Sequence, residues 1–147
     1  MNFRAIFLVL SILFSCTADY AEIRKINRES LFHDNSSKIW VINKVLKKGV
    51  NYAALKLKNK DVIIFYSSGR ILIQPLKTLG TFPSKTGTLN ISSDSKSCAF
   101  LFPKEKWTFK TIKISSSQIK LKSKISSAFD FDLELITYPD SESLKLD

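Results

Sequence analysis

The chain has little of what most catalytic and metal sites are made from. In 147 residues it contains one histidine, His33, and two cysteines, Cys16 and Cys98. A serine or cysteine nucleophile needs a neighbouring base, and zinc sites need several histidine or cysteine ligands at short spacing. The four glycines are too scattered for a phosphate-binding loop. We therefore expect no enzyme activity, no cofactor and no metal site.

Acidic side chains are also scarce. The chain has 13 of them and 23 lysines and arginines, which gives a formal net charge of +10. Such a balance favours nucleic acid, anionic membranes or acidic glycans as partners. The charge is uneven: residues 38–60 hold seven lysines and no acid, whereas residues 130–147 hold six acids and one lysine. Most of these charges alternate with apolar residues, which is typical of the solvent-facing side of a strand. Nucleic acid is not an expected partner, because the N-terminus indicates export.

The apolar run near the N-terminus, residues 5–14, is too short to span a bilayer comfortably. At about 1.5 Å per residue it covers roughly half of a 30 Å hydrocarbon core. Arg4 precedes the run and small residues follow it, which is the layout of a secretory signal. We predict a signal peptide at residues 1–15 and an exported protein.

Cys16 directly follows Ser15, and the sequence Leu13-Phe14-Ser15-Cys16 resembles the lipobox of bacterial lipoproteins. The resemblance implies that Cys16 is the lipid attachment site and the mature N-terminus. Its acyl chains would then anchor the protein to the bacterial cell envelope, at the outer membrane. Two alternatives stay open. Cleavage after Ala18 would release a secreted or periplasmic soluble protein, and an uncleaved run would itself be the anchor.

Four segments are distinguished by composition. Residues 1–15 are the signal peptide, and residues 16–37 are a lipidated N-terminus and polar tether, with a helical turn or two expected within 20–32. Residues 38–138 form one β-domain, large enough to bury a core. Residues 139–147 are an acidic C-terminal tail.

From residue 38 onward the apolar pattern has a period of two, which is typical of half-buried strands. Polar turn-forming clusters separate the runs, and each of the four prolines lies at the end of a run, where a missing backbone donor costs least. Strands are expected at 38–46, 52–58, 61–66, 70–76, 88–92, 97–102, 106–114, 119–125 and 129–137.

The last two runs specify their own register. If residues 126–128 are a hairpin loop, Leu121 lies opposite Leu133 and Lys120 lies opposite Glu134. The same register pairs Lys122 and Lys124 with Asp132 and Asp130, and Ile119 and Ile125 with Leu135 and Phe129. Three oppositely charged pairs then lie on one face and three apolar pairs on the other. The three acids are accordingly interpreted as structural and not as a catalytic carboxylate pair.

Cys98 is left without an intramolecular partner by either cleavage route. A four-residue loop at 93–96 places it opposite Ile91, on the apolar side of its strand. This register favours a small buried hydrophobe over a reactive thiol or an intermolecular bridge.

The apolar phase changes within the run 106–114. A four-residue loop after this run places Ile112 opposite Leu121, and also places Lys113 opposite Lys120. A bulge near Thr111 would restore a single apolar face.

Eight or nine antiparallel strands in an up-and-down meander, each with one apolar face, are best satisfied by closing the sheet into a small barrel. The chain resembles the small lipocalin-like (calycin-type) domains of bacterial lipoproteins over about residues 36–138. The matching features are Lys38-Ile39-Trp40, residues 61–65 with Ser68-Gly69, residues 87–92 with Asp94, Trp107-Thr108-Phe109 and Ile119-Lys120-Leu121. The resemblance implies an all-β lipocalin-like barrel, and a flattened barrel or β-sandwich is the alternative.

Four aromatic residues, Trp40, Phe65, Trp107 and Phe109, are candidates for the wall of a ligand cavity, although such residues also form plain core. Two functions follow. The first is a non-catalytic envelope lipoprotein whose filled barrel is a structural module or binds a protein partner in the envelope. The second is a carrier or sensor that holds a small apolar or amphipathic ligand inside the barrel. The first is favoured, because a barrel of this size has little interior room.

Overall fold

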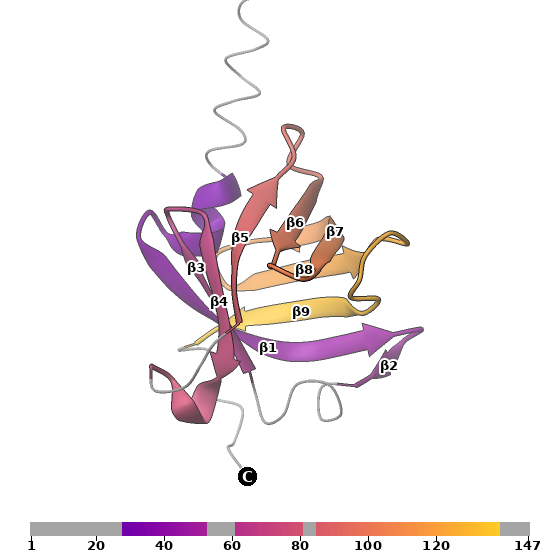
Figure 1. The fold of residues 1–147 in the computed structure, drawn as a ribbon, viewed down its shortest axis with the longest axis horizontal. Helices are drawn as coiled ribbons and strands as arrows, with labels where there is room; N and C mark the ends of the chain where they lie inside the picture. The colour runs from indigo at the N-terminus through magenta and orange to yellow at the C-terminus, as the bar shows by residue number, and fades with distance from the viewer. Residues whose placement is uncertain (1–27, 53–60, 81–84, 139–147) are drawn as a thin grey trace, which may run out of the picture.

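The computed structural model describes residues 28–52, 61–80 and 85–138, and these residues are mostly β-strand (Figure 1). A helical turn at 28–33 precedes the first strand, and a short 3-10 helix, η1 (Leu76–Thr78), follows the fourth. The strands are β1 (Ser37–Lys47), β2 (Val50–Asn51), β3 (Asp61–Tyr66), β4 (Arg70–Pro75), β5 (Lys85–Ile91), β6 (Ser97–Leu101), β7 (Lys106–Ile114), β8 (Gln118–Ser123) and β9 (Asp132–Thr137).

The strands form a closed antiparallel barrel, which confirms the predicted fold class. From β3 onward each strand pairs with the next one along the chain, and β9 pairs with β1. The eleven-residue β1 makes this closure possible, because its first half pairs with β3 and its second half with β9. Among the described strands, the two-residue β2 pairs only with the end of β1, so the other eight strands make the barrel wall.

The predicted positions of the eight wall strands agree with the structure, except at the ends of a few strands, whereas β2 was not predicted. β5 begins at Lys85, three residues before its predicted start, and β9 begins at Asp132, three residues after. The strand predicted at 52–58 lies almost wholly outside the described residues. The connection Ser67-Ser68-Gly69 is a tight turn as expected, and Gly69 has a φ of 79°, a conformation that glycine adopts without strain.

The predicted β8–β9 register is confirmed for the half of the hairpin that lies farther from its loop. Ile119 lies opposite Leu135, Leu121 lies opposite Leu133, and Lys120 lies opposite Glu134. The four apolar side chains are buried in the barrel, and Lys120 Nζ lies 3.4 Å from Glu134 Oε2 on the outside.

The prediction is wrong for the half of the hairpin nearer its loop, because β8 and β9 separate before a three-residue loop is reached. The Ser123 hydroxyl donates to the carbonyl of Phe129 (2.8 Å), and the Lys124 N–H donates to the carbonyl of Thr108 in β7 (2.9 Å). The chain after Ser123 therefore stays alongside β7 and no longer pairs with β9. As a result Ile125 is fully exposed and Asp130 pairs with Lys47 instead of Lys124.

The β7–β8 pairing contains the predicted irregularity. The register shifts between Thr111 and Lys113, so Thr111 lies opposite Leu121 and Ile112 is the extra residue. The predicted pairing of Ile112 with Leu121 is therefore wrong, and Ile112 is 55% exposed on the outer surface. The bulge brings Ile114 back opposite Ile119, as expected.

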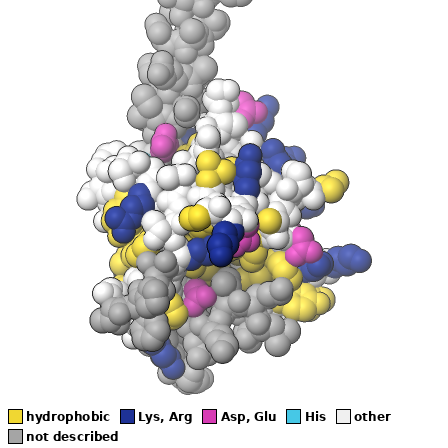
Figure 2. All heavy atoms as spheres, in the orientation of Figure 1, with side chains coloured by type: hydrophobic (Ala, Val, Ile, Leu, Met, Phe, Trp, Pro, Cys, Tyr) yellow, Lys and Arg dark blue, Asp and Glu magenta, His cyan; other side chains and the backbone are white. Residues whose placement is uncertain are grey.

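The two ends of the barrel differ. One end, here called the helix end, holds the turn 28–33 and the connections 67–69, 92–96 and 115–117. Arg28 donates to the Ser95 carbonyl there, and Ser36 and Lys38, which follow the turn, bond to Ser67 and Ser116. At the opposite end, here called the far end, lie the β1–β2 turn and the connections 102–105 and 124–131. On the face seen in Figure 2, basic side chains are dispersed and acidic side chains lie among them.

Candidate functional site

The four aromatic residues singled out in the sequence all lie inside the barrel. Trp40 in β1, Phe65 in β3 and Phe109 in β7 are fully buried, and Trp107 in β7 is 5% exposed. They do not all touch directly. Phe100 in β6, which the sequence reasoning did not select, brings three of them together.

Phe100 is the centre of this aromatic cluster. Its ring centroid lies 5.6 Å from that of Phe65, 5.1 Å from that of Phe109 and 6.4 Å from that of Trp107. Tilted and edge-to-face contacts of this kind add to the stabilisation given by buried area. The middle of the barrel is therefore occupied by ring against ring contacts.

The helix end is closed by Phe32 from the helical turn. Its ring packs edge-to-face on Phe65 at 4.9 Å, and its carbonyl accepts a hydrogen bond from the buried indole Nε1 of Trp40 at 2.8 Å. His33 is also buried, and its Nδ1 accepts the N–H of Asn35. The helical turn expected within 20–32 is thus present over 28–33, in the segment expected to be a tether, and residues 20–27 lie outside the described residues.

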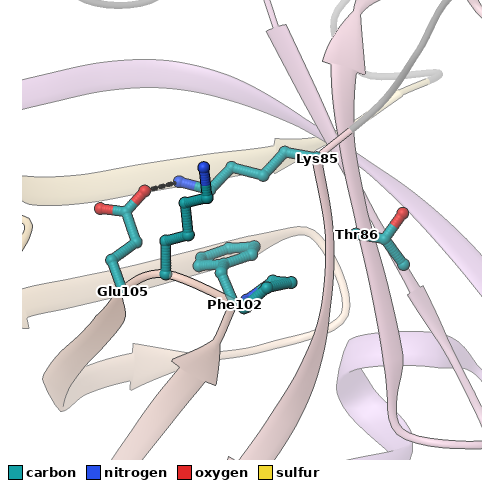
Figure 3. A pocket seen from close by; sticks show the side chains of 6 residues that line it. Lys85, Thr86, Phe102 and Glu105 are labelled. Atoms are coloured by element: carbon teal, nitrogen blue, oxygen red, sulfur yellow. Dashed lines mark hydrogen bonds and ion pairs between the residues drawn. The ribbon is translucent and has the colours of Figure 1, made fainter.

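At the far end, Trp107 is the centre of a mixed aromatic and charged cluster. Its ring stacks on Phe129 at 4.2 Å, and its indole Nε1 donates to Glu105 Oε2 at 2.8 Å. Lys85 Nζ forms an ion pair with the same carboxylate and lies 4.1 Å from the ring centroids of both Trp107 and Phe102 (Figure 3). The hydrogen bonds from Lys85 and Trp107 hold the pKa of Glu105 below its usual range.

A pocket of about 450 Å³ lies beside this cluster, on the rim of the far end. Its floor is the ring of Phe102, and charged side chains project around it (Figure 3). The residues that line it are Lys85, Thr86, Phe102, Pro103, Lys104 and Glu105. Because Lys85 and Glu105 neutralise each other, Lys104 is the exposed charge that this rim offers to a small amphipathic molecule.

The structure tests the prediction for one of the two cysteines. Cys98 in β6 is buried opposite Ile91, as the register predicted, and burial raises the pKa of its thiol to about 12. It is therefore a small apolar core residue. Cys16, the predicted lipid attachment site, lies outside the described residues.

The acids of the last strand are held by structural partners, as the sequence reasoning expected. Glu134 is buried between Lys120 and Lys44, at 3.4 and 3.7 Å, and Asp132 accepts the backbone N–H of Ser123 at 2.8 Å. Within the described ranges, no three histidine, cysteine or acidic side chains gather as metal ligands would.

Among the described residues, no helix has the length and apolar character needed to cross a membrane. Comparison of the chain with protein-family models and with curated protein sequences finds no match.

Proposed function

We propose that this chain is a non-catalytic lipoprotein of the bacterial cell envelope, exported by its signal peptide and anchored through Cys16. In this proposal the lipocalin-like barrel is a structural or protein-interaction module, and its outer surface and loops do the binding.

The observation that carries the proposal is the occupied interior. Phe32 at the helix end contacts Phe65, Phe65 contacts Phe100, and Phe100 contacts Trp107, which stacks on Phe129 at the far end. This series of rings extends along the inside of the barrel, through the space where a carrier would hold its ligand. We expect a barrel filled in this way to bind its partners through its outer surface.

The test is native mass spectrometry of untagged residues 17–147, a form without acyl chains, purified without detergent from the cells that make it. A co-purifying protein at a defined stoichiometry is the expected result. A reproducible additional mass of a few hundred daltons on the monomer would contradict the interaction module.

A carrier is the second candidate function, and the pocket beside Phe102 is the observation that favours it. The Lys104→Ala variant distinguishes the two, because Lys104 is exposed and its loss leaves the core intact. A carrier would lose its bound molecule in this variant while the fold is retained. Trp107→Ala is the matched core change, and in a filled barrel it unfolds the protein without a separate binding defect.

Anchoring is tested independently by Cys16→Ser. After a high-salt wash, which weakens electrostatic binding, the variant is expected to leave the membrane fraction, because acyl chains provide the attachment that salt does not disrupt. If the salt-washed variant fractionates with membranes as the wild type does, the lipid anchor is wrong.

A further inference from the structure

The outer surface of β7 and β8 carries a compact group of lysines around one exposed isoleucine. This group, here called the basic face, consists of Lys110, Ile112, Lys113, Lys120 and Lys122. The bulge creates it, because Ile112 and Lys113 both point outward opposite Lys120. No acidic side chain of β7 or β8 lies among them.

Like charges face each other twice across this strand pair. Lys110 lies opposite Lys122, and Lys113 lies opposite Lys120. Directly opposed like charges destabilise an antiparallel pair. The second pair is relieved, because Lys120 reaches Glu134 and Lys113 Nζ donates to Gln118 Oε1 at 2.9 Å.

The first pair is not relieved in this way. Neither Lys110 nor Lys122 forms an ion pair with another residue in 28–52, 61–80 or 85–138. On the β6 side, the neighbour of Lys110 is the neutral Ser97. On the β9 side, Asp132 is next in register to Lys122, but its carboxylate accepts the Ser123 N–H and forms no ion pair with Lys122. Among the described residues the two lysines thus lie side by side without an ion pair, and an external anion would relieve their repulsion.

The composition of the face indicates which kind of anion. Protein interfaces are enriched in arginine and aromatic residues and depleted in lysine, whereas here every charge is a lysine. Lysine is a compact, mobile point charge suited to a layer of phosphate headgroups, and an exposed aliphatic side chain among lysines suits the boundary between headgroups and acyl chains. Ile112 provides that side chain at the centre of the group.

We propose that the basic face binds the surface of membranes that contain anionic lipids, with the lysines among the headgroup phosphates and Ile112 inserted between them. This inference goes beyond the proposed function and does not depend on acylation at Cys16. Binding would orient the barrel with β7 and β8 toward the bilayer. The wall opposite β7 and β8 would then face other partners.

The test measures partitioning of the purified full chain onto vesicles of phosphatidylcholine alone and of phosphatidylcholine with about one-third phosphatidylglycerol. Every protein carries Cys16→Ser, so no acyl chain forms. The apolar N-terminal run is the same in every variant and cancels in the comparison. The wild-type face is expected to prefer the anionic vesicles, and added salt is expected to weaken that preference.

The variant Lys110→Gln/Lys122→Gln removes the unrelieved pair. Each lysine is expected to account for about a fivefold change, so the double variant should partition about 25-fold more weakly onto anionic vesicles. The matched control, Arg70→Gln/Lys77→Gln, removes the same charge from β4 and η1, three strands away from β7. It should retain most of the binding.

Ile112→Ser tests the apolar contact and should weaken binding about threefold to fivefold. Thermal unfolding confirms that each variant is folded, and the double lysine variant should be no less stable than wild type because it removes a repulsion. Equal partitioning of the wild type onto neutral and anionic vesicles would overturn the proposal. Equal losses in the two double variants would also overturn it, because net charge and not this face would then be responsible.

Discussion

Replacing Gly87 by alanine should destabilise the barrel, although a strand glycine normally gains from this change. Gly87 lies in β5 on the inner side, where the ring of Phe102 folds over it. A Cβ at this position would lie 2.5 Å from the carbonyl oxygen of Leu101 and 2.7 Å from Phe102 Cδ1. The glycine is therefore required by the close approach of β6 to β5.

Two effects of opposite sign decide how much Gly87→Ala changes the free energy of unfolding. Alanine restricts the unfolded chain more than glycine does, which stabilises the fold by about 0.5–1 kcal/mol. Overpacking a filled core costs about 1–3 kcal/mol, and here the Leu101 contact is with backbone of a paired strand, which cannot rotate away. Displacement of the Phe102 ring from its contacts with Trp107 and Lys85 adds to the cost. We expect the free energy of unfolding to fall by about 1–3 kcal/mol.

Urea unfolding, followed by tryptophan fluorescence and by far-ultraviolet circular dichroism, gives that free energy. Thr88→Ala is the matched control, because it changes the exposed neighbour on the same strand and should alter stability by about 0.5 kcal/mol or less. If Gly87→Ala is as stable as the wild type or more stable, the reasoning from close approach is refuted.

Three further predictions concern the two barrel ends and the core thiol. Trp40→Phe leaves the carbonyl of Phe32 without its indole donor, and should cost about 1–3 kcal/mol in unfolding free energy and speed amide hydrogen exchange in 28–33; unchanged exchange would show that the turn is held by other contacts. The lowered pKa of Glu105 means that its contribution is complete above the unfolded-state pKa and is lost as pH falls through the folded-state pKa. Glu105→Gln should therefore flatten the fall in stability between pH 5 and pH 2, and an unchanged slope would contradict the assignment. In a Cys16→Ser background, Cys98 should react with an aromatic disulfide reagent at pH 8 only when the protein is unfolded; reaction of the folded protein at the rate of a free thiol would be inconsistent with its burial.

Period-two patterning predicted the registers well where it was strong. In β8 and β9 it aligned Leu121 with Leu133 and Lys120 with Glu134, because a slip by one residue would have reversed both faces. It failed at Ile125, which is apolar but lies beyond the end of its strand. There the Ser123 hydroxyl bonds to the Phe129 carbonyl and the Lys124 N–H bonds to Thr108 in β7, and no hydrophobic pattern encodes such bonds.

The candidate site was predicted only in part, for a related reason. The four aromatic residues were correctly placed on inward positions, but their partners depend on tertiary contacts. Lys85 meets Glu105 across 20 residues of sequence, and the polar stretch that begins β5 gave no sign of a strand. Phe32 was missed because it stands next to His33 and Asp34 in a polar segment, although its carbonyl and its ring both close the barrel.

The joining of β1 to β9 has a consequence for how the chain reaches its folded state. Trp40 lies opposite Thr137, so the pairing that completes the wall connects residues nearly 100 positions apart. Contacts of such separation form slowly, because a long loop must be ordered before they contribute. While the chain is being synthesised and β9 is not yet free to pair, the sheet has two open edges, at β1 and at β8. Both edges would be available to other extended chains. Assembly is thus delayed until the last strand is available, and a truncation that removes β9 should aggregate instead of forming a smaller barrel.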